Sequence, residues 1–305
     1  MGLITPYPVK LAPFFADAVW GGSALISEYH KAAPGPRLAE SWEASALPGR
    51  ESVAVNGLWA GAPLSEIWAV WGDPGPDGRI PPFPILVKLL DAEAPLSVQV
   101  HPDAAAAAAD PGAEAKTEAW LILQARPGAQ LVYGLRECVT ETQLRQAAED
   151  GTVEHLLNFV PVQPGDVFFL PAGRIHALGG GILLAEVQQA SATTYRLYDY
   201  GRPRPLQIEQ AIRCAEKTPA PSVDSVPGGS CRVLVKCPFF SMEEIVLTRR
   251  LLRAEQGRIV TVLDGQGQIG TAPVRKGDTL FLPRAMEDLP ITGSFRTLCV
   301  SWGSM

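Results

Sequence analysis

The alternation of apolar and polar residues predicts many short β-strands and few helices. Between residues 96 and 101, the apolar residues Leu96, Val98 and Val100 alternate with polar residues that include Gln99 and His101. A period of two is typical of a strand with one apolar face and one polar face. An amide and an imidazole on the same face indicate a lined pocket rather than a solvated surface.

Longer apolar runs predict buried strands before and after this stretch. The segment ILVKLL at 85–90 is one, and ILLAEVQQ at 182–189 is another, with Glu186 on one of its faces. The segment KTEAWLIL also has the composition of a strand. Its residues Lys116 and Glu118 are two positions apart, so we expect them to share a face.

Two segments have helical signals. The clearest runs from 140 to 158, where Thr140 and Gln143 have the spacing of a capping box. In the second, Asp103 can cap a short helix formed by the six alanines at 104–109. Elsewhere prolines and glycines are frequent, as expected for turns between short strands.

An internal repeat indicates two copies of one β unit. GDTLFLPRA at 277–285 is similar to GDVFFLPAG at 165–173, and a segment with the composition of a linker, 217–230, separates the copies. The second copy has Asp288 where the first has His176, and no histidine follows the linker. We therefore predict that the second unit keeps the architecture without a metal.

Composition restricts the possible functions of the chain. It has 305 residues, a formal net charge of -6 and 47% hydrophobic residues, which is typical of a globular protein with a sizeable core. An acidic chain without clusters of lysine and arginine argues against a nucleic-acid surface. Five cysteines without CxxC spacing, no apolar run long enough to cross a membrane and no secretory signal predict a reduced, cytoplasmic protein.

Four residues have the chemistry of a metal site. Gln99, His101 and Glu118 offer an amide oxygen, an imidazole nitrogen and a carboxylate, and His176 follows a Pro-x-Gly turn at the start of the next strand. Zinc accepts these ligand types, and a catalytic zinc site keeps one position open. Each residue alone has a structural alternative, such as a Gln–His hydrogen bond or a Lys116–Glu118 pair, but the four together favour a metal.

The segment that leads to His176 resembles a motif of a known family. The segment GDVFFLPAGRIHAL is similar to the second cupin motif, from Gly165 through Pro171 and Gly173 to His176. It departs from the motif at its end, where Gly180 replaces an asparagine. The resemblance implies a β-barrel that brings the ligands together.

The first cupin motif is present in an altered form that narrows the family. The usual motif is HxH followed by a glutamate. In this chain Gln99 stands at the position of the first histidine, and His101 and Glu118 match the rest. Together with KTEAW, AVWGG, LAESWEAS and TTYRLYDYGR, these segments resemble a type I mannose-6-phosphate isomerase of the short bacterial form. The resemblance covers nearly the whole chain.

The resemblance implies an all-β fold of two cupin (jelly-roll) barrels with a small helical insertion at about 137–158. It implies a catalytic, metal-binding domain at 1–220 and a smaller cupin-like domain without metal ligands at 230–305. We expect a monomer or a weak homodimer.

The resemblance also implies roles for individual residues. It implies one Zn²⁺ ion per chain, held by Gln99, His101, Glu118 and His176. Arg196 corresponds to an arginine near the reacting carbons, although it could instead form a core salt bridge with Asp199 or Glu186. Ser97 and Lys88 correspond to residues that hold the sugar phosphate, and Lys116 and Glu186 line the same cavity.

The expected reaction is the interconversion of mannose 6-phosphate and fructose 6-phosphate. It moves a proton between carbons 2 and 1 through an enediol, with the metal as Lewis acid and Arg196 stabilising the enediolate. Lys116, Glu186 and a metal-bound water are all candidates for the base. The alternatives are another metal-dependent cupin enzyme, such as a dioxygenase or a glucose-6-phosphate isomerase, and a non-catalytic sugar-phosphate-binding homologue.

Overall fold

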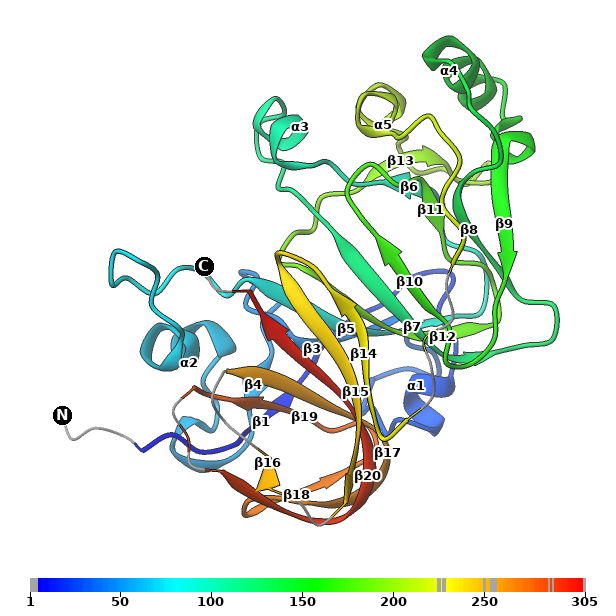
Figure 1. Cartoon of the computed structure of the whole chain (residues 1–305). Helices are drawn as coiled ribbons and strands as arrows, with labels where there is room; N and C mark the ends of the chain where they lie inside the picture. Colours follow the sequence, from blue (N-terminus) through cyan, green and yellow to red (C-terminus); the bar gives the residue numbers. More distant parts are fainter. Residues whose placement is uncertain are drawn as a thin grey trace. The chain divides into compact units, whose positions relative to one another are not determined.

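The computed structural model of the chain describes residues 5–223, 226, 229–248, 251–252, 257–284, 286 and 288–303. They form two compact units (Figure 1). Unit 1 comprises Met1–Asp17, Ser23–Leu89 and Val226–Met305, and unit 2 comprises Ala18–Gly22 and Leu90–Ser225. The predicted linker, 217–230, contains the last boundary between the units, although its residues 224, 225, 227 and 228 are outside the described part of the chain. The division into 1–220 and 230–305 stays a prediction.

Unit 1 is built mainly from β-strands. Its strands are β1 (Val9–Ala12), β2 (Phe14–Ala16), β3 (Glu40–Ala44), β4 (Val53–Ala54), β14 (Cys231–Lys236), β15 (Phe240–Thr248), β16 (Leu251–Leu252), β17 (Arg258–Ile269), β18 (Ala272–Arg275), β19 (Thr279–Leu282) and β20 (Leu289–Trp302). Its helices are α1 (Ala24–Ser27), η1 (Gly57–Trp59) and α2 (Leu64–Trp71). The strand β5 (Ile85–Ala92) carries the chain from unit 1 into unit 2.

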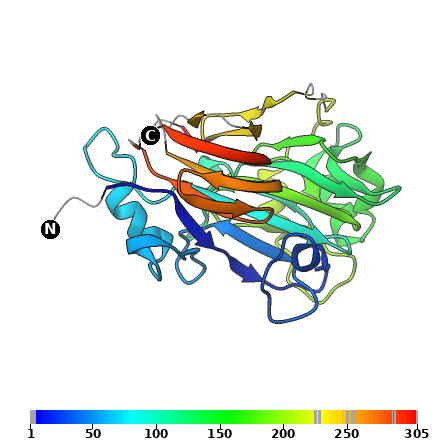
Figure 2. The same ribbon diagram turned by 90° about the horizontal axis from the view of Figure 1, so that it is seen from below.

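The N-terminal strand of unit 1 pairs with the C-terminal part of the chain. The main sheet has the order β14-β15-β20-β17-β19-β1-β4, and Val9 of β1 lies opposite Phe281 of β19. Figure 2 shows β1, in blue, beside the orange and red C-terminal strands. Val9 and Phe281 are both fully buried, so apolar burial favours this long-range pairing.

Unit 2 holds two groups of antiparallel strands. One has the order β10-β7-β12 and the other β13-β6-β11-β8-β9. The strands are β6 (Val98–Val100), β7 (Glu118–Ala125), β8 (Gln130–Leu135), β9 (Leu157–Pro161), β10 (Val167–Leu170), β11 (His176–Ala177), β12 (Ile182–Gln189) and β13 (Tyr195–Tyr198). The helices are α3 (Ala104–Ala108), α4 (Glu141–Glu149), η2 (Val153–Leu156) and α5 (Ile208–Cys214).

Helices of unit 2 cover one face of its five-stranded sheet (Figure 1). Leu144 of α4 and Ile212 of α5 are buried in one cluster with Val98 and Val100 of β6. Gln99 alternates with these two valines, so it lies on the opposite face of β6, away from the helices. The predicted capping box of Thr140 and Gln143 is confirmed at the start of α4.

The sequence prediction of a mostly β protein is confirmed, and the strand pairs of its sheets are antiparallel. The predicted helical insertion contains α4 and η2, and the alanine helix is capped by Asp103, whose side chain accepts from the amide of Ala106. None of the sheets formed by the described residues closes into a barrel. No helix of the described residues is long and apolar enough to cross a membrane.

Candidate metal centre

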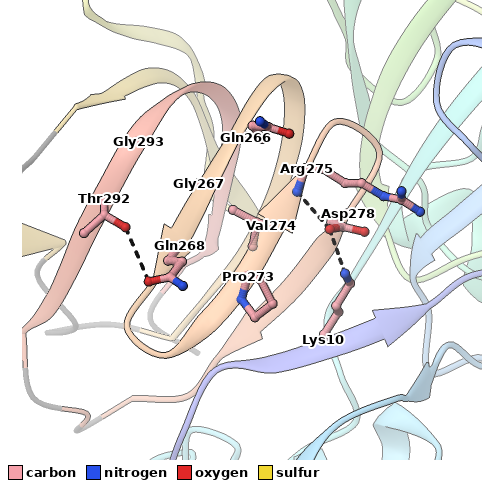
Figure 3. Close-up of a pocket in the computed structure, with 10 residues that line it drawn as sticks. All are labelled: Lys10, Gln266, Gly267, Gln268, Pro273, Val274, Arg275, Asp278, Thr292 and Gly293. Atoms are coloured by element: carbon pink, nitrogen blue, oxygen red, sulfur yellow. Dashed lines mark hydrogen bonds and ion pairs between the residues drawn. The ribbon is translucent and has the colours of Figure 1, made fainter.

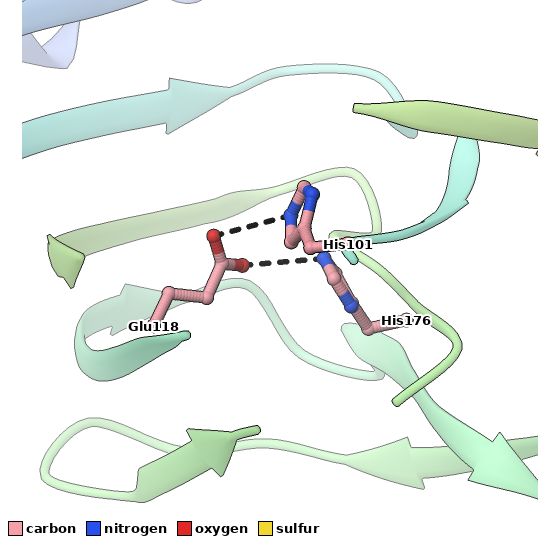
Figure 4. Close-up of side chains that lie close together, drawn as sticks. All are labelled: His101, Glu118 and His176. Carbon is pink, nitrogen blue, oxygen red and sulfur yellow. Dashed lines mark ion pairs between the residues drawn. The ribbon is translucent and has the colours of Figure 1, made fainter. Parts of the chain in front are cut away.

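Three of the predicted ligands meet inside unit 2. Glu118 lies between two imidazoles, with its Oε2 atom 3.3 Å from Nε2 of His101 and its Oε1 atom 3.2 Å from Nε2 of His176 (Figure 4). The ligand atoms of all three lie within 4.8 Å of one another, and all three side chains are buried. A single ion could therefore contact all three.

Strand register places the fourth predicted ligand beside them. Gln99 of β6 lies directly opposite His176 of β11 on one side and opposite Arg196 of β13 on the other. Directly opposed residues project from the same face of an antiparallel sheet. The three side chains therefore form one row across three strands, with the Gln99 amide nitrogen 3.3 Å from Nε2 of His176.

Two backbone carbonyls orient the imidazoles. Nδ1 of His101 lies 2.9 Å from the carbonyl oxygen of Thr193, and Nδ1 of His176 lies 2.8 Å from that of Arg174. A carbonyl accepts only, so each Nδ1 carries the proton and each Nε2 keeps its lone pair for the centre. The sequence analysis did not identify Thr193 or Arg174, because a backbone carbonyl leaves no signal in residue type.

Lys116 supplies the positive charge of the centre. Its Nζ atom lies 2.7 Å from Oε2 of Glu118 and 3.2 Å from Nε2 of His101. Burial would raise the pKa of Glu118, but Lys116, His101 and His176 outweigh it and hold that pKa well below its usual range. Burial, together with Lys116, lowers the pKa of His101 to about 3. The site therefore holds a carboxylate and a neutral imidazole at neutral pH.

The donor set fits a metal ion better than a closed hydrogen-bond network. Both carboxylate oxygens of Glu118 are buried and, among the described residues, have no partner with hydrogen-bond geometry, although Lys116 and both histidines lie within ion-pair distance. Buried polar atoms without such partners are rare in proteins and call for an explanation. One carboxylate, two correctly oriented imidazoles and an adjacent amide are suited to zinc.

Glu186 connects to the centre through a tryptophan. Its Oε2 atom accepts a hydrogen bond of 2.8 Å from Nε1 of Trp120, which lies directly opposite it in the β12–β7 pair. The Trp120 ring also meets the His176 ring edge-on, with centroids 5.4 Å apart. Trp120 was not among the predicted site residues, but it shares a strand face with Glu118, and period-two spacing could have identified it.

The alternative salt bridge of Arg196 with Asp199 is not formed. Both oxygens of Asp199 are 2.7 Å from Arg204 atoms, and Arg202 contacts the same carboxylate. The guanidinium of Arg196 has no ion pair among the described residues, and its buried Nε has no hydrogen-bond partner there. In the same part of the chain Arg196 forms no ion pair with Glu186 either, so its guanidinium is available to a ligand.

The two predicted phosphate-binding residues have different surroundings. Ser97 is 4% exposed and lies in unit 2, just before β6. Lys88 belongs to unit 1, where its Nζ is 3.3 Å from a Glu40 oxygen and 4.8 Å from the ring centroid of Trp42. Their role in holding phosphate stays a prediction.

A separate cavity lies in unit 1. It is an open groove of about 540 Å³ beside the hairpin of β17 and β18 (Figure 3). Its lining residues are Lys10, Gln266, Gly267, Gln268, Pro273, Val274, Arg275, Asp278, Thr292 and Gly293. It has no histidine or cysteine and a single carboxylate, which is paired with Lys10, so it does not resemble the unit 2 centre. Within the described chain, the group formed by His101, Glu118 and His176 is the one potential metal cluster of this kind.

Comparison with known proteins agrees with the geometry. The family model for the phosphomannose isomerase type I catalytic domain matches residues 9–127. The mannose-6-phosphate isomerase of Streptococcus mutans is 38% identical over 309 residues, which cover 95% of this chain and 97% of that protein. The chain belongs to the type I phosphomannose isomerase family.

Further members of the family are similar over the same length. The mannose-6-phosphate isomerase ManA of Bacillus subtilis is 34% identical, over 95% of this chain and 97% of that protein. A crystal structure of mannose 6-phosphate isomerase from Bacillus subtilis has a TM-score of 0.88 and 31% identity, and covers 96% of this chain and 99% of that one. The resemblance predicted from the motifs is confirmed.

Proposed function

We propose that this phosphomannose isomerase family member interconverts mannose 6-phosphate and fructose 6-phosphate with one bound zinc ion. The observation that carries the proposal is the buried group of His101, Glu118 and His176, with Gln99 and Arg196 in register beside it. Zinc held by Gln99, His101, Glu118 and His176 would supply a Lewis acid for the sugar oxygens. A half-turn of the Gln99 amide presents its oxygen to that position.

The residues around the centre divide the proton chemistry between them. We assign Glu186 as the base at the sugar carbons, since a carboxylate oxygen can accept a proton and the hydrogen bond from Trp120 fixes its orientation. Lys116 contacts Glu118 and His101, so its side chain is placed to donate hydrogen bonds at the centre. Arg196, with no anion of its own, binds the negative oxygen of the enediolate.

We propose a structural role for the part of the chain without metal ligands. We propose that both units have cupin-type architecture, with catalysis within 1–220 and a smaller metal-free part at 230–305. The repeated turn segment supports this view, and its second copy pairs with Arg258 where the first pairs with Glu118. Phosphate binding by Ser97 and Lys88, a monomer or weak homodimer, and a cytoplasmic location remain predictions.

A coupled assay on protein of known metal content tests the function. We expect turnover of mannose 6-phosphate, proportional to bound zinc, and far slower turnover of free mannose, because the neutral sugar offers no anion to the cationic groups. Glucose 6-phosphate serves as the control substrate. Stoichiometric zinc without turnover of mannose 6-phosphate would contradict the proposal, and equal rates for mannose and its phosphate would exclude recognition of the phosphate.

A further inference from the structure

One buried acid next to Arg196 is fully occupied by two other arginines. Asp199 is 2% exposed and directly follows β13, the strand that carries Arg196. Nε and Nη2 of Arg204 donate to its two carboxylate oxygens, each at 2.7 Å. We call Asp199, Arg202 and Arg204 the Asp199 cluster.

Arg202 completes the cluster and is fixed independently of the carboxylate. Its Nη2 atom is 2.7 Å from Oδ1 of Asp199, an ion pair that lacks hydrogen-bond geometry. Its Nη1 donates to the carbonyl of Pro95 at 2.9 Å, its Nε donates to the carbonyl of Asp199 at 3.2 Å, and its guanidinium lies over the Tyr200 ring. These contacts keep a second positive charge on Asp199.

The cluster and Arg196 influence each other electrostatically. Burial lowers the pKa of Arg196, Arg204 and Arg202 lower it further, and Asp199 is the acid whose charge opposes them. An unshielded Asp199 would therefore be the natural partner of Arg196. The three guanidinium groups and one carboxylate instead leave an excess of positive charge next to the row of Gln99 and His176.

We propose that the Asp199 cluster is a positioning device that keeps the Arg196 guanidinium unpaired and available to an oxygen anion of the substrate. Arg202 and Arg204 occupy the carboxylate that would otherwise capture Arg196. The inference rests on the proposed function, in which Arg196 binds the enediolate. None of the three cluster residues needs to touch the sugar.

A variant that removes the charge of Arg204, and a double variant that also removes the charge of Asp199, test the proposal. In Arg204→Gln the carboxylate of Asp199 is freed, Arg196 turns to it, and kcat falls by about 10- to 100-fold, the loss expected when one charge-assisted contact is withdrawn from the transition state. In Asp199→Asn/Arg204→Gln the competing anion is gone as well, and kcat recovers most of that loss. The matched control is Arg126→Gln, which removes a surface guanidinium from its partner Glu93 and leaves kcat unchanged.

A purely structural cluster would respond differently. In that case Asp199→Asn/Arg204→Gln would be no more active than Arg204→Gln, and the melting temperature would fall together with kcat. Either this pattern or an unchanged kcat in Arg204→Gln overturns the inference. If Arg204→Gln does not fold, Arg204→Lys carries the same test, because an ammonium keeps the charge but cannot bind both oxygens in parallel. The expected loss is then smaller and is again recovered by Asp199→Asn.

A second readout does not depend on catalysis. Phenylglyoxal modifies accessible, unpaired guanidinium groups, and peptide mass spectrometry measures its rate at Arg196. We expect Arg196 to be reactive in the parent protein, protected in Arg204→Gln and reactive again in the double variant. Equal rates in all three contradict the inference. A parent protein with this pattern but no isomerase activity would contradict the proposed function alone.

Discussion

The two units contain the same turn but have different chemistry. In unit 2, Gly165 has a φ of 94° and Asp166 accepts from the amide of Gln163; in unit 1, Gly277 has a φ of 89° and Asp278 accepts from the amide of Arg275. The strands that follow have the same register, with Leu170 opposite Glu118 and Leu282 opposite Arg258. Similar backbone geometry in the two copies therefore places a carboxylate at one position and a guanidinium at its counterpart.

Each unit also buries a glutamate next to a lysine, but only one of these pairs is complete. In unit 1, Lys31 lies 2.6 Å from Glu43, and the hydroxyls of Ser41 and Thr279 donate to the two Glu43 oxygens. In unit 2, the oxygens of Glu118 face Lys116 and two imidazoles without hydrogen-bond geometry. A satisfied network holds a fold together, whereas buried oxygens without such partners are suited to binding a ligand.

The largest expected effect comes from removing one ligand of the unit 2 centre. His176→Ala should lose the bound metal and with it the isomerase activity, because three donors remain and the carboxylate faces an empty position. Asp288→Ala, at the corresponding place in the repeat, is the control and should keep both. Elemental analysis of the purified proteins measures the difference. Stoichiometric metal in His176→Ala would place the site elsewhere.

Arg196 in unit 2 and Arg258 in unit 1 extend the comparison, since each has a buried Nε atom without a hydrogen-bond partner among the described residues. Arg196→Ala should lower kcat by about 100- to 1,000-fold, the usual cost of removing one donor to a developing oxyanion. Metal content and melting temperature should stay at the parent values. Arg258→Ala, in unit 1, should leave kcat unchanged. An intact kcat in Arg196→Ala would exclude a catalytic role for this residue.

The complete network of unit 1 should show its importance in stability rather than activity. Glu43→Gln leaves the buried Lys31 charge without compensation, which typically costs about 3–5 kcal/mol of unfolding free energy. Urea denaturation measures the loss. The folded protein should bind metal as before. If Glu43→Gln lost metal but kept its stability, the roles assigned to the two glutamates would have to be exchanged.

The sequence analysis named the residues that meet in unit 2 because their signals are local. Period-two alternation placed Gln99 with His101, and the turn before His176 marked the end of a strand. Local patterns cannot specify long-range partners. The pairing of Val9 with Phe281, the assignment of Lys88 to the other unit, and the occupation of Asp199 by Arg202 and Arg204 all depend on tertiary packing.

The protonation of His101 gives the metal-free protein a predictable pH dependence. Its pKa is lowered to about 3 in the folded state, from an ordinary value of 6.5, by burial and by Lys116. Between these values the unfolded chain binds a proton that the folded protein does not, so stability falls as pH decreases, by up to about 1.4 kcal/mol per unit. Urea denaturation of chelator-treated protein between pH 7 and about 4 measures this slope. His101→Gln should have a shallower slope, and an equal slope would assign the proton to another group.

The smallest effects come from the shared turn itself. An alanine at either glycine adopts an unfavourable positive φ, which costs about 1–2 kcal/mol. At Gly165 a Cβ atom meets nothing within 4 Å, so Gly165→Ala should show only this cost. At Gly277 the Cβ atom would lie 2.1 Å from the carbonyl oxygen of Tyr29, so Gly277→Ala should lose more stability. Thermal denaturation of the two variants compares them directly. Equal melting temperatures would mean that the Tyr29 backbone moves away without cost, and that the turn of unit 1 is packed no more tightly than that of unit 2.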